Sequence, residues 1–305
     1  MRGVGPLAAD TLAEILDGGQ AFRWNRIATA GADCSPPAVH ATAREDFLWK
    51  GGWGEHVVEL RLGPEGRVHW RTPCAQHDET RRALAAYFAT DRDFSALADR
   101  LPWRTDAHLA RCLAAFPGLR ILRQPLGETL LGFLCSATKQ IVQIKQMVAL
   151  LARRHGAPLG ADHRLPTWEE LARVPERDLR ACLLGFRARY IADTARFLAE
   201  NPGWLAETEQ APYPEARDRL CTLPGVGAKI ADCVLLFGAG RLEAFPVDTW
   251  ILQALARRYG LDGWPPAQVA QFGRAHFGPL AGLAQQYLFA WERRFGRDTP
   301  APRRD

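Results

Sequence analysis

The chain has 305 residues, of which 47% are hydrophobic and 10% aromatic, enough to bury a sizeable core in about two domains. This composition excludes an intrinsically disordered protein. The formal net charge of +5 permits an acidic partner such as nucleic acid but does not establish one, because many basic proteins never bind DNA.

The N-terminal stretch MRGVGPLAADTLAEILDGG has no sustained apolar run before Asp10, so we expect no signal peptide. No apolar stretch of the sequence is long enough to span a bilayer. We therefore expect a soluble, cytoplasmic protein with no membrane partner.

Residues 20 to about 72 have the pattern of β-strands. Two short aromatic-rich segments, QAFRWNR (20–26) and REDFLWK (44–50), precede two alternating runs, HVVELRL (56–62) and RVHWR (67–71). The Gly-Pro-Glu-Gly stretch between these two runs is a good hairpin signal. The segment therefore predicts an antiparallel sheet.

From about Asp78 onward the sequence has the periodicity of amphipathic helices. The predicted helices cover 79–88, 93–101, 106–116, 178–186, 190–200, 214–222, 228–238, 248–260 and 278–296. The apolar stretch 126–155 predicts two helices with a break near Ala137 and Thr138. The expected fold class is α+β, with an N-terminal antiparallel sheet domain and flanking helices (1–115), an all-helical domain (116–295) and a loose polar tail (296–305).

The cysteines are scattered, odd in number and form no CxxC pair; they are Cys34, Cys74, Cys112, Cys135, Cys182, Cys221 and Cys233. This pattern is typical of reduced intracellular thiols. It also excludes a conventional four-cysteine iron–sulfur or zinc site, so we expect neither cofactor.

The stretch CTLPGVGAKIADC (221–233) predicts a helix, a turn, and a second helix that begins near Ala228. Gly225 and Gly227 can adopt backbone angles that other residues resist, and they let backbone amides approach a ligand closely. Together with the start of the second helix they offer N–H donors for a phosphate. The pattern is that of a helix–hairpin–helix, which holds the DNA backbone without reading sequence; the alternative is an ordinary helical pair in a core.

Lys229, one of only four lysines, lies in the first turn of that second helix. It shares a face with Cys233, beside an apolar stripe of Ile230, Val234 and Phe237. The helix dipole and partial burial disfavour an ammonium at this position, and a neutral amine is a nucleophile. The alternative is an exposed, solvated lysine.

The segment FPVDTW (245–250) predicts a turn followed by a helix, with Asp248 as the N-cap that accepts hydrogen bonds from orphan amides. That structural role is expected whatever the function. A capping carboxylate is also a fixed anion, which can face a developing positive charge in a pocket.

The segment LCTLPGVGAKIADCVLLF (220–237), with Asp248 nineteen residues after Lys229, resembles the helix–hairpin–helix–Gly/Pro–Asp (HhH-GPD) superfamily of DNA glycosylases. Within it, the closest resemblance is to the eukaryotic-type 8-oxoguanine DNA glycosylases. Their motifs are similar to GQAFRW (19–24), LGFRARY (184–190) and AGLAQ (281–285) with Phe289. The resemblance runs from about residue 11 to residue 295.

The resemblance implies a TATA-binding-protein-like antiparallel sheet joined to helical domains, with the active site in the cleft between them. It implies a monomeric base-excision-repair enzyme that acts on double-stranded DNA containing a damaged purine, at the nucleoid of a bacterium or in the nucleus of a eukaryote. The damaged nucleotide would be flipped into a pocket. Lys229 would attack the sugar C1′ and displace the base, and the resulting Schiff base would allow β-elimination, which nicks the strand on the 3′ side. Asp248 would stabilise the cationic sugar and assist proton transfer.

The matching motifs also imply a pocket for the flipped base. The carbonyl of Gly19 would accept the N7 hydrogen that 8-oxoguanine has, whereas guanine would leave this acceptor facing a lone pair. Gln285 would bind the Watson–Crick edge, while Phe289 and Cys233 would sandwich the base, with Phe237 in the same pocket. Without the resemblance, Gln285 and Phe289 are ordinary residues four apart on an amphipathic helix.

The implied DNA contacts come from several segments. Phe186 would wedge into the duplex near the vacated position, and Arg187 would reach the partner base. The remaining expected DNA contacts are Thr138, Lys139, Gly225, Gly227 and Trp250. The backbone carbonyls of Cys221, Leu223 and Val226 would hold a structural monovalent cation in the hairpin.

The sequence departs from the family where the opposite base is read. The family has an asparagine run after its Cys-Ser, and the first asparagine fills the hole left by the flipped base; here the segment is CSATKQ (135–140). A second reader, an arginine, aligns with Gln143. We therefore expect a weaker or different opposite-base preference. Trp250 stands where better-known members have a phosphate-contacting histidine, and its alternatives are a phosphate contact through the indole N–H or a place in the core.

Three other functions fit parts of the pattern. An alkylpurine DNA glycosylase of the same superfamily lacks the lysine and uses the aspartate with water, so Lys229, Gly19 and Gln285 argue against it. A thymine-glycol-type endonuclease has the Lys–Asp pair but normally carries iron–sulfur cysteines. A non-catalytic helix–hairpin–helix module would bind DNA without turnover.

Overall fold

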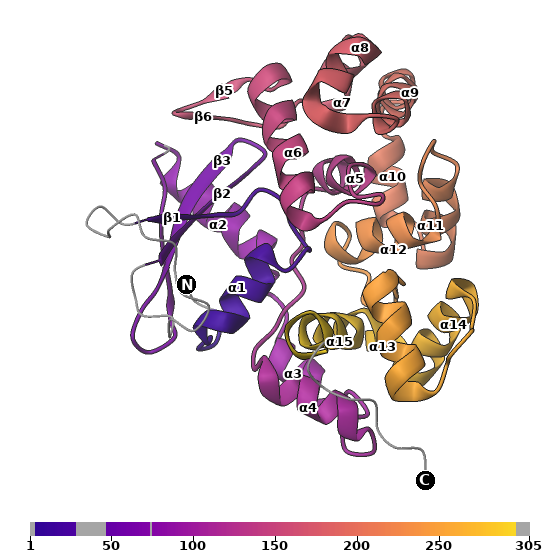
Figure 1. The fold of residues 1–305 in the computed structure, drawn as a ribbon. Helices are drawn as coiled ribbons and strands as arrows, with labels where there is room; N and C mark the ends of the chain where they lie inside the picture. Colours follow the sequence, from indigo (N-terminus) through magenta and orange to yellow (C-terminus); the bar gives the residue numbers. More distant parts are fainter. Residues whose placement is uncertain (1–3, 29–46, 74, 297–305) are drawn as a thin grey trace.

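The computed structural model describes residues 4–28, 47–73 and 75–296 (Figure 1). The start of the predicted strand at 44–50, almost all of the polar tail, and the thiols of Cys34 and Cys74 lie outside the described residues.

A four-stranded antiparallel sheet forms the N-terminal part, in the order β1 (Asn25–Ala28), β2 (Phe47–Trp53), β3 (His56–Leu62) and β4 (Val68–Arg71). Each strand pairs with the next one along the chain. The amide of Gly66 donates to the carbonyl of Gly63 at 2.9 Å, which closes the predicted hairpin between β3 and β4. The predicted sheet is confirmed, but QAFRWNR (20–26) becomes a strand only from Asn25 onward.

Two helices flank the sheet, α1 (Ala9–Asp17) and α2 (His77–Tyr87). The buried Leu12, Ile15 and Leu16 of α1 follow helical spacing, so this short helix presents one apolar face to the core. Tyr87 of α2 lies against Trp53 of β2, with ring centroids 4.5 Å apart.

The rest of the described chain is mainly helical. Its helices are α3 (Phe94–Asp99), α4 (Ala107–Ala115), α5 (Leu126–Leu134), α6 (Ile141–His155), α7 (Trp168–Ala172), α8 (Glu176–Leu179), α9 (Arg187–Glu200), α10 (Trp204–Gln210), α11 (Tyr213–Cys221), α12 (Ala228–Phe237), α13 (Thr249–Tyr259), α14 (Pro266–Phe277) and α15 (Ala281–Phe295). A short hairpin of β5 (Pro158–Leu159) and β6 (Asp162–His163) follows α6. The α+β fold class, with the sheet before the helices, is confirmed.

The predicted break in 126–155 is present between α5 and α6. The predicted helix at 178–186 is not continuous: α8 ends at Leu179, and the π-helical turn that follows (Arg180–Leu184) is broken by non-helical backbone angles at Cys182 and at Leu183, whose φ is +64°. Four helices lacked a prediction of their own, namely α1, α7, α10 and α14.

Figure 1 shows the sheet on one side of the molecule and most helices on the other, with α6 beside the sheet. Buried apolar side chains from both parts form one continuous cluster. Helix α15 packs against α4, α13 and α14, and most of its side chains are buried. Among the described residues, no helix combines the length and the apolar character needed to cross a bilayer.

Candidate active site

The hairpin between α11 and α12 is built around Gly225. Its φ is +78°, and a Cβ there would lie 2.4 Å from Cδ2 of Tyr190, so only glycine fits. The amide of Val226 donates to the carbonyl of Leu223 at 3.1 Å and closes the turn. Gly227, in contrast, has an ordinary φ of −98°, so the prediction of an unusual backbone angle there is wrong. A Cβ at Gly227 would meet no atom within 4 Å.

Lys229 lies half-buried in the first turn of α12, as predicted from its spacing. Its Nζ is 5.8 Å from the ring centroid of Phe133, a buried residue at the end of α5. Phe133 stacks on Phe237 with centroids 5.7 Å apart. The amine therefore lies over the ring of Phe133, which is itself stacked on Phe237. Phe133 was missed from the sequence because nothing local links it to Lys229.

Asp248 is the N-cap of α13, as predicted, and its carboxylate accepts a hydrogen bond from the amide of Ile251 at 2.9 Å. Burial raises the pKa of Asp248, while the amide of Ile251 and the positive charge of Lys229 both lower it. The two predicted catalytic side chains, from different helices, are thus close enough to interact electrostatically.

Cys233 lies one helical turn after Lys229 and is buried. Burial raises the pKa of its thiol to about 12, and the nearby charge of Lys229 only partly opposes this. The sulfur is therefore a neutral, apolar surface at neutral pH, which suits contact with a flat base better than nucleophilic chemistry.

Gln285, on α15, is buried beside the segment that carries Asp248. Its Nε2 donates to the carbonyl of Pro246 at 3.1 Å, and its Oε1 accepts from Nε2 of Gln286 at 3.0 Å. Both ends of the amide are therefore satisfied in the protein without DNA. Gln286, a second buried glutamine, was not identified from the sequence.

Gly19 and Phe289 come together although they are far apart in the chain. Gly19 has φ +103°, and a Cβ there would lie 3.1 Å from Cδ1 of Ile141 and 3.8 Å from Cε1 of Phe289. Nη1 of Arg293 donates to the carbonyl of Gly18 at 2.9 Å, which ties the Gly19 loop to α15. Ile141 and Arg293 were missed, since no sequence pattern links them to residue 19.

Gln20 fixes the other side of the same loop and is completely buried. Its Nε2 donates to the carbonyl of Arg120 at 3.0 Å, and its Oε1 accepts from the amide of Leu122 at 2.9 Å. The backbone carbonyl of Gln20 accepts from Nε2 of Gln124 at 2.7 Å. The carbonyl of Gly19 is therefore held by rigid neighbours on both sides.

The side chains expected to contact DNA occupy two neighbouring loops. Thr138 and Lys139 are exposed between α5 and α6, and Phe186 is exposed just before α9. Arg187 is different, because it is only 3% exposed. Its guanidinium donates to the carbonyl of Ala137, to Oγ1 of Thr138 (3.0 Å) and to the carbonyl of Leu184 (3.1 Å).

These loops also contact the hairpin. The ring of Phe186 lies 5.9 Å from that of Tyr190, and Tyr190 packs against Gly225. Trp250 is half-buried in the first turn of α13. Gln143 is exposed, and its Oε1 accepts from the amide of Gln140 at 3.2 Å, which caps the start of α6.

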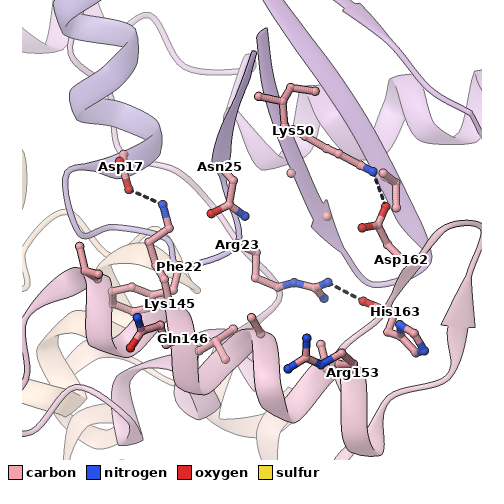
Figure 2. A pocket seen from close by; sticks show the side chains of 18 of the residues that line it. Asp17, Phe22, Arg23, Asn25, Lys50, Lys145, Gln146, Arg153, Asp162 and His163 are labelled. Carbon is pink, nitrogen blue, oxygen red and sulfur yellow. Dashed lines mark hydrogen bonds and ion pairs between the residues drawn. The ribbon is translucent and has the colours of Figure 1, made fainter. Parts of the chain in front are cut away.

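A cavity of about 920 Å³ lies between the sheet and α6 (Figure 2), and Ile141 and Arg293 beside the Gly19 loop line it. Lys229, Asp248 and Gln285 do not line it. Four of its charged side chains form the ion pairs Lys145–Asp17 (2.7 Å) and Lys50–Asp162 (2.6 Å). The cavity is therefore not the chemical centre.

Two family models match the chain in order. Residues 8–130 match 8-oxoguanine DNA glycosylase, N-terminal domain, and residues 131–276 match the HhH-GPD superfamily base excision DNA repair protein. The N-glycosylase/DNA lyase OGG1 of Arabidopsis thaliana is 31% identical over 293 residues, which cover 90% of this chain and 75% of that protein. The N-glycosylase/DNA lyase of Saccharomyces cerevisiae is 30% identical over 270 residues, covering 82% and 69%.

A solved structure has the same fold. The Clostridium acetobutylicum 8-oxoguanine glycosylase/lyase, in complex with double-stranded DNA containing cytosine opposite 8-oxoG, superposes with a TM-score of 0.82. The two proteins are 30% identical, and the match covers 93% of this chain and 92% of the other. The chain therefore belongs to the 8-oxoguanine DNA glycosylase/DNA lyase family of the HhH-GPD superfamily.

Proposed function

We propose that this protein excises 8-oxoguanine from duplex DNA and then cleaves the strand at the resulting site. The observation that carries this function is that the half-buried Lys229, in the first turn of the helix after the hairpin, interacts electrostatically with the half-buried Asp248. A DNA-binding module has no need for a half-buried carboxyl beside an amine. An alkylpurine glycosylase has no need for the amine.

The chemistry follows from these two groups. Once it has given up its proton, the amine of Lys229, which lies over the ring of Phe133, attacks C1′ of the flipped nucleotide. The carboxylate of Asp248 stabilises the positive charge that develops on the sugar as the base departs. The lysine–sugar Schiff base then loses a proton at C2′, and β-elimination expels the 3′ phosphate.

The base pocket is formed by Gly19, Cys233, Gln285 and Phe289. The rigid support of the Gly19 carbonyl is central, because a fixed acceptor rejects guanine by leaving two acceptors opposed. Gln285 would exchange its bond to Pro246 for bonds to the base edge. Phe289 supplies a half-buried ring for stacking, and the neutral thiol of Cys233 supplies the opposite face.

DNA is proposed to lie across the hairpin and the two loops that carry Thr138 and Phe186. Amides at the start of α12 face a phosphate, and the open space at Gly227 lets the strand approach. Arg187 would reach the partner base only by exchanging one of its present carbonyl partners. The protein would act as a monomer, at the nucleoid or in the nucleus.

A monovalent cation in the hairpin is also proposed, on the carbonyls of Cys221, Leu223 and Val226. The fit is chemically reasonable, because carbonyl oxygens are hard ligands and the Leu223 oxygen, which accepts one hydrogen bond from Val226, keeps a second lone pair. When bound, the cation would add positive charge beside the phosphate.

The test is a labelled duplex with one 8-oxoguanine, analysed with and without hot alkali. Base excision makes the strand alkali-labile, and lyase activity nicks it without alkali. We expect both alkali-labile sites and alkali-independent nicks in the duplex with 8-oxoguanine. We expect neither in a duplex with guanine or an N-alkylated purine at the same position. Excision of only the alkylated purine, or binding without any product, would reject this function.

A further inference from the structure

We propose that Leu183 is a second DNA wedge, which acts beside Phe186 and inserts between bases next to the flipped nucleotide. The inference rests on the proposed function. It assigns a positioning role to a residue that the family motif LGFRARY (184–190) does not include.

The first observation is backbone strain. Among the described residues only three that are not glycine have a positive φ, namely Ala89, Thr138 and Leu183 (φ +64°). A branched, bulky side chain at such an angle is unfavourable, and strain of this kind concentrates at functional sites. Folding alone would favour glycine at position 183.

The second observation is exposure. Leu183 is 59% exposed and Phe186 is 51% exposed, whereas Cys182 and Leu184 on either side of Leu183 are completely buried. The turn therefore buries its alternate residues and presents two large apolar side chains three positions apart. An exposed leucine contributes little to a core, so neither strain nor exposure is explained by stability.

The third observation is that Arg187 clamps both strained loops. It donates to Ala137 and Thr138 in one loop and to Leu184, next to Leu183, in the other. Two of the three strained residues therefore flank the carbonyls that a single guanidinium holds. Because Phe186 connects through Tyr190 to the phosphate-binding hairpin at Gly225, this clamped edge borders the proposed DNA path.

Double-stranded DNA is the occupant that this edge fits. Leucine and phenylalanine are typical of side chains that insert between base steps, unstack them and kink the duplex. A flipped nucleotide leaves a gap that must be filled or it closes again. Thr138 is shorter than the asparagine that the resemblance leads one to expect, so a second apolar wedge would compensate for the smaller filling group.

The test compares Leu183→Gly, Leu183→Ala and Leu183→Met. Flipping is followed by stopped-flow fluorescence of 2-aminopurine next to 8-oxoguanine, and single-turnover excision is measured on the same duplex. Cleavage of a duplex that already contains an abasic site is measured in parallel, because that site has no stacked base to displace. Trp264→Ala, which removes another exposed apolar side chain, is the matched control.

We expect the glycine and alanine variants to flip and excise at least tenfold more slowly, with abasic-site cleavage within twofold of the wild type. The methionine variant should retain most of the rate, and thermal unfolding should show Leu183→Gly to be at least as stable as the wild type. Unchanged flipping in both the glycine and alanine variants would overturn the proposal, as would equal losses on the abasic duplex. Failure of the wild type to excise at all would instead reject the proposed function.

Discussion

Burial raises the pKa of the Asp248 carboxyl, and the positive charge of Lys229 lowers it. The ionisation of the carboxyl thus depends on opposed influences, with burial on one side and the amide of Ile251 and the charge of the proposed nucleophile on the other. A change at Lys229 therefore alters the ionisation of Asp248, which is the arrangement expected of groups that share a reaction.

Asp248→Asn should lower the rate of 8-oxoguanine excision by roughly 100- to 10,000-fold, the usual range for a removed acid–base group. Because asparagine is also a good N-cap, the free energy of unfolding should change by less than about 1 kcal/mol. Single-turnover kinetics and urea denaturation measure the two effects. Asp93→Asn, which changes another capping carboxylate at the start of α3, is the control and should keep full activity.

The pH dependence of excision should also depend on the ionisation of Asp248. Burial raises the pKa of Asp248 above its unfolded value. The carboxyl therefore adds stability at pH values below its unfolded pKa, and this stability is lost as pH rises through the folded pKa. The working form is the carboxylate, so excision should fall as pH drops through a range above that of an ordinary aspartate.

Single-turnover rates from acid to neutral pH would show this limb in the wild type and in Asp93→Asn. A rate that stays constant down to the usual titration range of an aspartate would contradict the assignment of the ionised carboxylate.

Gly19→Ala should abolish detectable excision and destabilise the fold by about 1–3 kcal/mol, because φ is +103° and the new methyl would press on Ile141. Gly203→Ala is the matched control, since Gly203 has φ +91° but nothing within 4 Å of the added Cβ. Equal losses of activity in the two variants would show that strain, and not the Gly19 carbonyl, limits the reaction.

The two hairpin glycines should respond differently. Gly225→Ala forces a methyl group against Tyr190 and should destabilise the protein. Gly227→Ala should leave the melting temperature unchanged, because its φ is ordinary and the space is open, yet weaken duplex binding at least tenfold by blocking the phosphate. Thermal unfolding measures the effect on stability, and fluorescence anisotropy measures duplex binding. An unchanged affinity of Gly227→Ala for the duplex would show that no phosphate binds at that position.

The opposite-base preference should be weak in the wild type and stronger in Thr138→Asn/Gln143→Arg. Asparagine tolerates the φ of +55° at position 138 better than threonine does, so Thr138→Asn should not destabilise the fold. Excision rates opposite the four bases should differ by less than roughly tenfold in the wild type and should favour cytosine more in the double variant. An unchanged ranking would show that other groups read the opposite base.

Much of the fold was predictable because its signals are local. The β3–β4 hairpin follows from alternation and a Gly-Pro turn, and the cap of α13 follows from Asp248. Two missed helices also had local signals: the capping box of Thr167 and Glu170 at α7, and Pro266 in the first turn of α14.

The remaining features depend on contacts between distant segments. The loop of Gln20 to Trp24 leaves the predicted strand because Gln20 bonds to residues about a hundred positions away. The turn before Gly185 breaks from helical geometry at Cys182 and Leu183, and Arg187 holds it against the loop of Ala137. Arg293 and Ile141 support Gly19 only after folding, so no sequence pattern could identify them.

The most direct test of the central claim is borohydride trapping on a duplex with one 8-oxoguanine. A covalent protein–DNA adduct should form with the wild type and with Lys50→Gln. Lys50 is paired with Asp162 in the cavity between the sheet and α6, which Asp248 does not line. No adduct should form with Lys229→Gln. An adduct of normal yield from Lys229→Gln would show that another amine attacks the sugar and would contradict the account.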